Sequence, residues 1–450
     1  MADVQCTQFE FACNTVTGNQ TILSNTGYTI KGYILISFQN TSNATFQIHS
    51  NVIMGFSDGT TSACTSANSQ DNVTTSNAAR GHINQVLEFR SQTDPFGTRD
   101  GLADHSSFGT GDDIVINWSD APSSAWKVYG LAFGGADFEC EVGQFAAGRT
   151  TAGNQSYTTT MANPEFGIFM TTVSTSTPSS YGDHGTFGMG VAFTTTKEGA
   201  LSGDSEDARP TSDTWQFFDD TWTATAHDGS SGGIAGSAEG WAAQFVSWDA
   251  NGWTWEFTEA PASVSTVFYA MVMKTAGLNL FDVGIVAKRT STGTTTINPT
   301  GVGQIVGLML FSDCANSSTS VNAHARYSMG VASSASLEGG GWTGDQDAAG
   351  ITITAKRSED SNILMMADEA DTVGSSTVLA IANVTVMGEN TFTLDYTTAD
   401  ATAAEIIWWV IGNGVTTAAA EGVAEAKRAF GKPMYESYTN PHVTQTIFGY

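Results

Sequence analysis

The chain has 450 residues, of which 40% are hydrophobic and 10% aromatic, enough apolar material for several folded domains. Its formal net charge is -28 at pH 7, because 45 acidic residues oppose only 17 basic ones. This charge repels a phosphate backbone, so nucleic acid is an unfavourable partner. Glycine occurs 48 times and charged residues make up only 14% of the chain, which is typical of β-strands joined by tight polar turns.

Neither an export signal nor a membrane span is expected from the sequence. Residues 1–5 have neither a basic nor an apolar region. The longest apolar runs, such as 406–411, have the length of a strand rather than of a bilayer. The cysteines are not spaced as zinc ligands and are predicted to be free, mostly buried thiols. They are Cys6, Cys13, Cys64, Cys140 and Cys314.

Three stretches of the chain begin alike and continue alike. The glycine of the opening turn is Gly18, Gly153 or Gly293, at intervals of 135 and 140 residues (153 − 18 and 293 − 153). Each stretch then has a histidine followed five residues later by Met-Gly. These histidines are His49, His184 and His324, again at intervals of 135 and 140 (184 − 49 and 324 − 184). Because histidine occurs only seven times in the chain, the shared spacing indicates an internal repeat.

The three stretches also end alike. Alternating strands at 113–118, 252–257 and 391–396 place an aromatic residue at Trp118, Phe257 and Tyr396. These aromatic residues are each 139 residues apart (257 − 118 and 396 − 257). A dense apolar strand follows at 126–133, 267–273 and 406–411. Such strands are expected to be buried on both faces of a sheet.

The sequence therefore predicts an all-β protein of three tandem antiparallel β-sandwich repeats, jelly-roll-like, with about eight or nine strands in each. The predicted boundaries are 7–140, 141–281 and 282–414. The rest of the chain, 415–450, is predicted to be an assembly arm. It begins with a short helix at 418–430, and its later aromatic and proline residues cannot form a core of their own. These residues are Pro433, Tyr435, Tyr438, Phe448 and Tyr450.

The repeated histidines are the sharpest candidates for chemistry. Strand alternation places His49 on the face opposite Phe46, Ile48 and Met54. One interpretation makes the three histidines ligands for a metal or a sugar, or protonation switches. The other makes each one a hydrogen-bonding spacer beside a glycine at which another segment crosses closely. No other His or Cys lies at a spacing useful for a metal, so the second interpretation is favoured and no metal site is predicted.

An acidic turn follows each histidine, and the densest contains Asp204, Glu206 and Asp207. Carboxylate oxygens of this kind bind calcium when enough of them converge. The spacing lacks the complete EF-hand pattern, so a solvated turn is favoured over a calcium site. Calcium is the only cofactor for which the sequence offers a candidate site.

Three tryptophans lie in segments rich in Gly, Ser, Thr and Asp, and two roles are open to them. They are Trp222, Trp241 and Trp342. If they are exposed, their rings are suited to stacking on sugars; the alternative is that they cap the end of a sandwich.

The sequence does not predict an enzyme. It contains no GxSxG, HExxH or phosphate-binding GxxxxGK[ST] motif, and no pair of carboxylates is selected by its spacing. The recurring positions are glycines, apolar strands and turns, which maintain a fold.

The opening GNQT at 18–21 and GNQS at 153–156, GIFM at 167–170, the His-x4-Met-Gly strands and VFYAMVM at 267–273 together form a recognisable pattern. The pattern resembles the repeated β-sandwich structural proteins of tailed bacteriophages, over about nine tenths of the chain. The resemblance implies a non-enzymatic virion protein, exposed on the particle surface as a tail or fibre component or as capsid decoration. The expected partners are other virion proteins and copies of the chain itself. The alternative is a glycan-binding receptor-recognition module or a bacterial surface adhesin, with host surface glycans as partners.

Overall fold

The computed structural model describes residues 2–92, 96–109, 112–175, 179–227, 239–314, 320–368 and 376–414. Within these ranges the chain forms strands and no helix, which confirms the all-β prediction. The predicted helix at 418–430 and the whole predicted arm, 415–450, lie outside the described residues.

The strands fall into three sets of eleven, which we call the first, second and third strand sets. The first set is β1 (Gln5–Ala12), β2 (Gly18–Leu23), β3 (Ile30–Ser37), β4 (Gln47–Ile48), β5 (Ser50–Ser57), β6 (Ser62–Ser69), β7 (Ala78–Ile83), β8 (Leu87–Arg90), β9 (Arg99–Phe108), β10 (Ile114–Asp120) and β11 (Lys127–Gly134). The second set is β12 (Glu139–Ala146), β13 (Gly153–Thr158), β14 (Phe166–Thr171), β15 (Ser179–Asp183), β16 (Phe187–Thr194), β17 (Lys197–Ser205), β18 (Thr214–Asp219), β19 (Ala224–His227), β20 (Glu239–Asp249), β21 (Gly252–Glu259) and β22 (Val267–Lys274). The third set is β23 (Phe281–Ala287), β24 (Gly293–Ile297), β25 (Ile305–Ser312), β26 (Ser320–Ala323), β27 (Ala325–Ser334), β28 (Leu337–Asp345), β29 (Thr354–Glu359), β30 (Leu364–Asp368), β31 (Thr377–Gly388), β32 (Thr391–Ala399) and β33 (Glu405–Gly412).

Each set supplies six neighbouring strands of a seven-stranded sheet and all of a four-stranded sheet. In the first set the larger sheet runs β1-β11-β3-β5-β6-β7 and the smaller one β2-β10-β9-β8. The corresponding strands of the other two sets have the same order: β12-β22-β14-β16-β17-β18 with β13-β21-β20-β19, and β23-β33-β25-β27-β28-β29 with β24-β32-β31-β30. All the pairs inside these sheets are antiparallel, as predicted.

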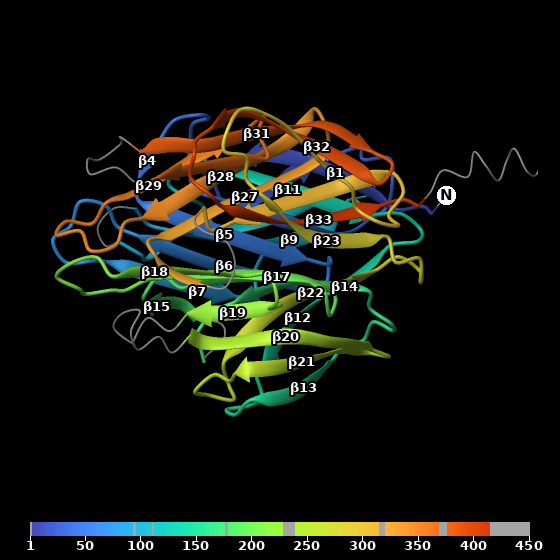
Figure 1. Cartoon of the computed structure of the whole chain (residues 1–450), viewed down its shortest axis with the longest axis horizontal. Helices are drawn as coiled ribbons and strands as arrows, with labels where there is room; N and C mark the ends of the chain where they lie inside the picture. The colour runs from blue at the N-terminus through green and yellow to red at the C-terminus, as the bar shows by residue number, and fades with distance from the viewer. Residues whose placement is uncertain are drawn as a thin grey trace, which may run out of the picture. The chain divides into compact units, whose positions relative to one another are not determined.

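The seventh strand of each larger sheet comes from a different set. β15 of the second set pairs with β7 of the first, and β26 of the third pairs with β18 of the second. β4 of the first set completes the circuit by pairing with β29 of the third, through Ala355 opposite Ile48 and Lys356 opposite Gln47. Figure 1 shows β4 beside β29, and both views show β15 beside β7. Each strand set therefore gives one strand to the large sheet of another set: the second to the first, the third to the second and the first to the third.

The central strands of the seven-stranded sheets are apolar and buried on both faces, as in β3 and β11. One face packs on the four-stranded sheet of its own set, as in the core formed by Tyr33, Leu35 and Trp118. The opposite faces of the three large sheets share one central core. In it, Phe166 of the second set stacks on Phe281 of the third, with ring centroids 4.8 Å apart. Burial on both faces explains the continuous apolar strands that the sequence contains.

All five cysteines are free, and Cys13, Cys64 and Cys314 are buried. This confirms the prediction of free, mostly buried thiols.

The glycine of the repeated Met-Gly pair lies where another segment crosses the strand. A Cβ built on Gly55 would lie 1.9 Å from the carbonyl oxygen of Val86, just before β8. A Cβ built on Gly190 would lie 1.8 Å from the carbonyl oxygen of Thr223, and one built on Gly330 would lie 1.8 Å from the carbonyl oxygen of Ile363. Any side chain at these positions would separate the two sheets of a sandwich.

We predict that Gly55→Ala destabilises the protein by about 1–3 kcal/mol or more, because the added methyl group collides with backbone that cannot move freely. Urea unfolding measures the change. Gly350→Ala is the control, because a Cβ at that position has no atom within 4 Å. Equal stability of the two variants would contradict the prediction.

Candidate functional site: a ring of interlocked loops

Three loops of the same construction join the sixth and seventh strands of the three sets. They are 70–77 between β6 and β7, 206–213 between β17 and β18, and 346–353 between β28 and β29. Each has an aspartate at its second position and a Ser or Thr five residues later. These are the acidic turns that follow the repeated histidines. We call the three loops together the loop ring.

Each repeated histidine accepts a hydrogen bond from the loop of its own set. The donor is the backbone N–H of the loop aspartate and the acceptor is the histidine Nδ1. Each bond is 3.0 Å long, and the pairs are Asp71–His49, Asp207–His184 and Asp347–His324. All three histidines have positive φ, at 66°, 66° and 77°, a conformation that residues other than glycine adopt rarely.

These contacts fit the interpretation of the histidines as hydrogen-bonding spacers. Nδ1 is occupied by a backbone donor, so this nitrogen is not available to a metal or a sugar. Burial, with a smaller contribution from the positive charge of Lys356, lowers the pKa of His49 to about 4. Burial also lowers the pKa of His324. The neutral imidazole is the form that keeps a lone pair for the loop.

The loop aspartates connect one set to another through their carboxylates. Asp71 Oδ1 accepts from the N–H of Thr354, at 2.8 Å, although the two residues belong to the first and third sets. The corresponding bonds are Ala78 to Asp207, at 3.0 Å, and Thr214 to Asp347, at 3.1 Å. In each case the donor is the first residue of the seventh strand of another set.

The loop hydroxyls connect the sets a second time. Ser76 Oγ donates to the carbonyl of Glu206, at 2.7 Å, and accepts from the N–H of Arg209, at 2.9 Å. Ser212 makes the same pair of bonds with Gln346 and Ala349, and Thr352 with Gln70 and Val73. Each hydroxyl residue also exchanges backbone hydrogen bonds with the neighbouring loop, such as Ala208 N–H to Ser76 O at 2.8 Å.

The contacts therefore form a closed circuit. Loop 70–77 bonds to loop 206–213, which bonds to 346–353, which bonds back to 70–77. Ser76, Ser212 and Thr352 are the buried hydroxyl residues of the three loops. Sequence reasoning found the aspartates but missed these hydroxyl residues. Each of these residues lies five positions after the loop aspartate, and this constant spacing is the sequence signal by which they can be found.

The acidic turn of the second set is neither solvated nor arranged as a calcium site. Asp204 and Glu206 are buried, which corrects the expectation of a solvated turn. Glu206 forms an ion pair with Arg209, and Asp207 binds Ala78. In the part of the chain that the structure describes, no three His, Cys, Asp or Glu side chains form a group that could hold a metal ion.

The expectation of exposed loop tryptophans is wrong for two of the three residues. Trp241 lies in β20 and Trp342 in β28, and both are 0% exposed inside their sandwiches. Trp222 is half-buried and stacks on Phe217, with ring centroids 4.9 Å apart. The small residues around Trp241 and Trp342 belong to strands, whose alternation directs these two rings inward. The remaining predicted residues, Pro433, Tyr435, Tyr438, Phe448 and Tyr450, lie outside the described residues.

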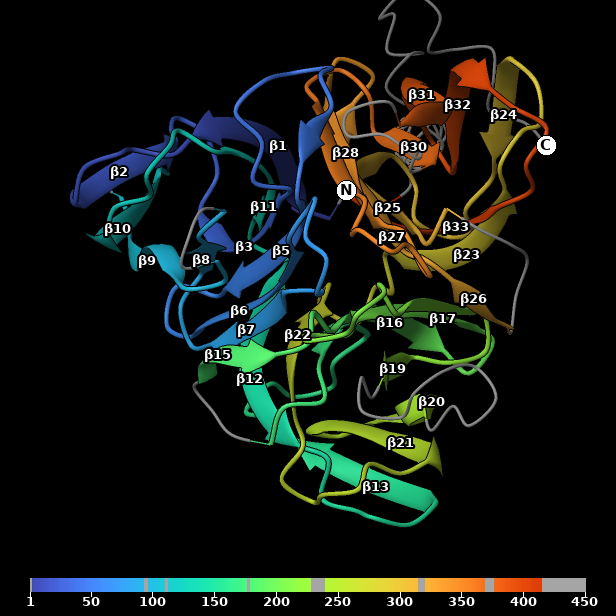
Figure 2. The same ribbon diagram turned by 90° about the vertical axis from the view of Figure 1, so that its left-hand side faces the viewer.

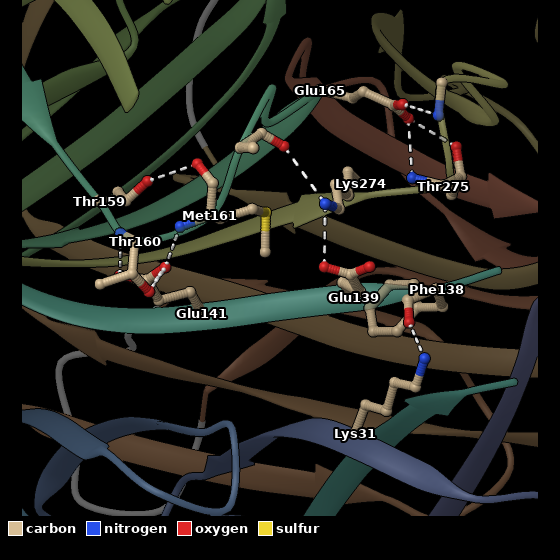
Figure 3. Close-up of polar contacts among 12 residues, drawn as sticks. Lys31, Phe138, Glu139, Glu141, Thr159, Thr160, Met161, Glu165, Lys274 and Thr275 are labelled. Carbon is tan, nitrogen blue, oxygen red and sulfur yellow. Dashed lines mark hydrogen bonds and ion pairs between the residues drawn. The ribbon is translucent and has the colours of Figure 1, made fainter. Parts of the chain in front are cut away.

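Acidic side chains also fasten loops within the second strand set and just after it, as Figure 3 shows in close-up. Glu141 accepts from the backbone N–H groups of Thr160 and Met161, at 2.9 and 2.6 Å. Glu165, which is buried, accepts from the N–H and hydroxyl of Thr275. These carboxylates hold loops in place and are not grouped around a common point.

Compared with known proteins, the sequence matches no family model, and no curated protein shows significant similarity to it. In the described part of the chain, no helix is long and apolar enough to cross a membrane.

We predict that Ser212→Ala lowers the free energy of unfolding by about 1–3 kcal/mol, because it removes the hydroxyl partner of a half-buried carbonyl, that of Gln346, and of a half-buried N–H, that of Ala349. Chemical denaturation measures the loss. Thr211→Ala is the matched control, since Thr211 is exposed and lies next to Ser212 in the same loop. A loss of similar size in both variants would argue against a specific role of the hydroxyl.

We also predict that His49 makes stability depend on pH. Its pKa is about 4 when folded, against about 6.5 when unfolded, so the unfolded chain takes up the proton first. The contribution is complete above about pH 6.5 and is lost as the pH falls towards 4, by about 3 kcal/mol. His49→Asn, which tolerates positive φ, should flatten this part of the urea-unfolding profile. An unchanged slope between wild type and variant would refute the assignment.

Proposed function

We propose that the chain is a non-enzymatic structural protein of a tailed-phage virion, built as three tandem copies of one β-sandwich and exposed on the particle surface. In this proposal it serves as a tail or fibre component or as capsid decoration. The observation that carries the proposal is the closed circuit of exchanged strands and interlocked loops. Three like units held in this way form a trimer within one polypeptide.

The physical logic favours a permanent building block. A trimer of separate chains dissociates on dilution, whereas three covalently joined copies stay at a fixed, high effective concentration. The shared central core and the hydrogen bonds of the loop ring then resist opening. The strongly negative charge keeps such a protein soluble at high copy number.

The proposed anchor is the arm, 415–450, whose aromatic residues suit docking on other virion proteins or on copies of the chain itself. It follows residue 414, where the last described strand set ends. The arm and the sandwiches are therefore expected to be separable in function.

We predict that deleting 431–450 abolishes incorporation into particles while leaving the folded part intact. The measurement is the amount of protein in purified particles, with the melting temperature of the isolated variant as the control for folding. A variant that folds and is incorporated as well as the wild type would overturn the proposed role of the arm.

The glycan-binding alternative loses its original basis. It relied on exposed tryptophan rings, and Trp241 and Trp342 are buried. The half-buried Trp222 alone offers too small a platform to favour this function.

A further inference from the structure

A polar cavity of about 330 Å³ lies between the first and second strand sets. Most of its wall belongs to the first set: the turn between β5 and β6, one residue after β7, and the middle of β9. The second set contributes one residue each from β12 and β22. The lining residues are Gly59, Thr60, Thr61, Ser62, Asn84, Asp104, His105, Ser106, Gln144 and Tyr269.

The cavity lies where the other two sets place a buried glutamate. Ser62 of β6, Glu198 of β17 and Glu338 of β28 correspond, because each lies two residues before the position opposite the crossing glycine Gly55, Gly190 or Gly330. Glu198 accepts from the N–H of Phe245, and Glu338 from the N–H of Val384, both at 2.8 Å. Burial raises the pKa of both glutamates to about 8, so each fills its site as an uncharged acid.

The residue that faces the missing glutamate has also changed. His105, Phe245 and Val384 correspond, since they lie opposite Ile116, Trp255 and Leu394 at an irregularity in the same pair of strands. Phe245 is buried and Val384 is fully buried, whereas His105 is only partly buried. Its backbone N–H donates to Asp104 Oδ1, at 2.8 Å. Where the second and third sets have a glutamate and an apolar side chain, the first set thus has a serine and an imidazole.

The imidazole of His105 is positioned by a hydrogen bond with a buried tyrosine. Its Nδ1 lies 3.1 Å from the hydroxyl of Tyr33, a fully buried residue. Burial raises the pKa of Tyr33, so its hydroxyl stays protonated, and it shares with Nδ1 a hydrogen bond whose direction depends on the imidazole tautomer. Burial lowers the pKa of His105 itself. The imidazole therefore lines the cavity while its Nδ1 is engaged by Tyr33.

The second strand set completes the wall. Gln144 and Tyr269 lie directly opposite each other in the β12–β22 ladder. The Tyr269 hydroxyl donates to Asn84 Oδ1, at 2.8 Å, which ties this wall to the first set. Asp58 lies in the turn between β5 and β6. It accepts from the N–H groups of Thr60 and Val142 and so fixes this turn against β12. The second set thus supplies one side of the cavity, through Gln144 and Tyr269.

We propose that this cavity binds an uncharged, hydroxyl-rich ligand of the size of a single sugar residue. The lining offers a carboxylate, two amides, an imidazole and several hydroxyls, which suits the paired donors and acceptors of adjacent sugar hydroxyls. No lysine or arginine lines it, and the chain carries a net charge of -28, so an anionic ligand is disfavoured. A volume of about 330 Å³ is at the small end of ligand sites.

The test is saturation-transfer NMR on the full chain with glucose, galactose, mannose and N-acetylglucosamine, and with the anionic N-acetylneuraminic acid for comparison. Ser62→Glu restores the residue type that the other two sets hold, fills the cavity, and is expected to abolish transfer from the bound sugar. Ser119→Glu is the matched control, because it adds the same charge at an exposed position of β10 and should leave transfer unchanged.

Asp104→Asn provides a second variant in case Ser62→Glu does not fold. It keeps an acceptor but removes the charge, and is expected to weaken binding by about tenfold. Absence of transfer from all four neutral sugars to the wild-type protein would overturn the proposal. Equal binding by folded Ser62→Glu, or stronger binding of N-acetylneuraminic acid than of any neutral sugar, would overturn it too. Each of these results leaves the proposed virion role standing, since that role is tested through the arm.

Discussion

The buried hydrogen bonds among the three loops are the constraint on which the rest of the structure depends. Each loop presents backbone N–H and carbonyl groups whose partners belong to a different strand set. A buried polar group without its partner costs about 1–3 kcal/mol, so no set can leave the circuit without several such losses. The strand exchange and the shared central core follow the same closed path. The three strand sets are therefore held together by one core, one set of exchanged strands and one loop circuit.

The positions that recur in the sequence each have a place in this arrangement. The repeated histidine turns the chain through positive φ and accepts from the loop aspartate, and the glycine of the Met-Gly pair makes room for a crossing carbonyl. Neither task involves solvent or a ligand. Asn or Gly usually occupies backbone positions with positive φ. Here a histidine does so, and its side chain also extends to the loop and accepts a hydrogen bond from it. The repeated histidines, which were the strongest candidates for ligand-binding residues in the sequence, are thus explained by backbone geometry.

How far the sequence could predict the structure depended on the range of the interactions. Alternation, turn glycines and dense apolar strands are local signals, and they correctly predicted an all-β antiparallel protein. Asp204 and Glu206 were expected to be solvated because their partners cannot be seen locally: Ser76, which covers the carbonyl of Glu206, is 130 residues away. Trp241 and Trp342 look like loop residues beside Gly and Ser, yet both lie in strands that face a core. The very short β4 gives no periodic signal at all.

Joining three similar units in one chain also changes what a single position can do. In a trimer of identical chains, a serine at the position of Glu198 and Glu338 would remove all three buried acids and open three cavities at once. Here Ser62 removes one acid, while the other two sets keep their glutamates and the packing that these provide. Cavities in packed interiors cost stability in proportion to their size, so confining the change to one unit limits the loss. The difference at Ser62 and His105 is therefore confined to one of the three strand sets, and the loops of that set keep the same contacts as the loops of the other two.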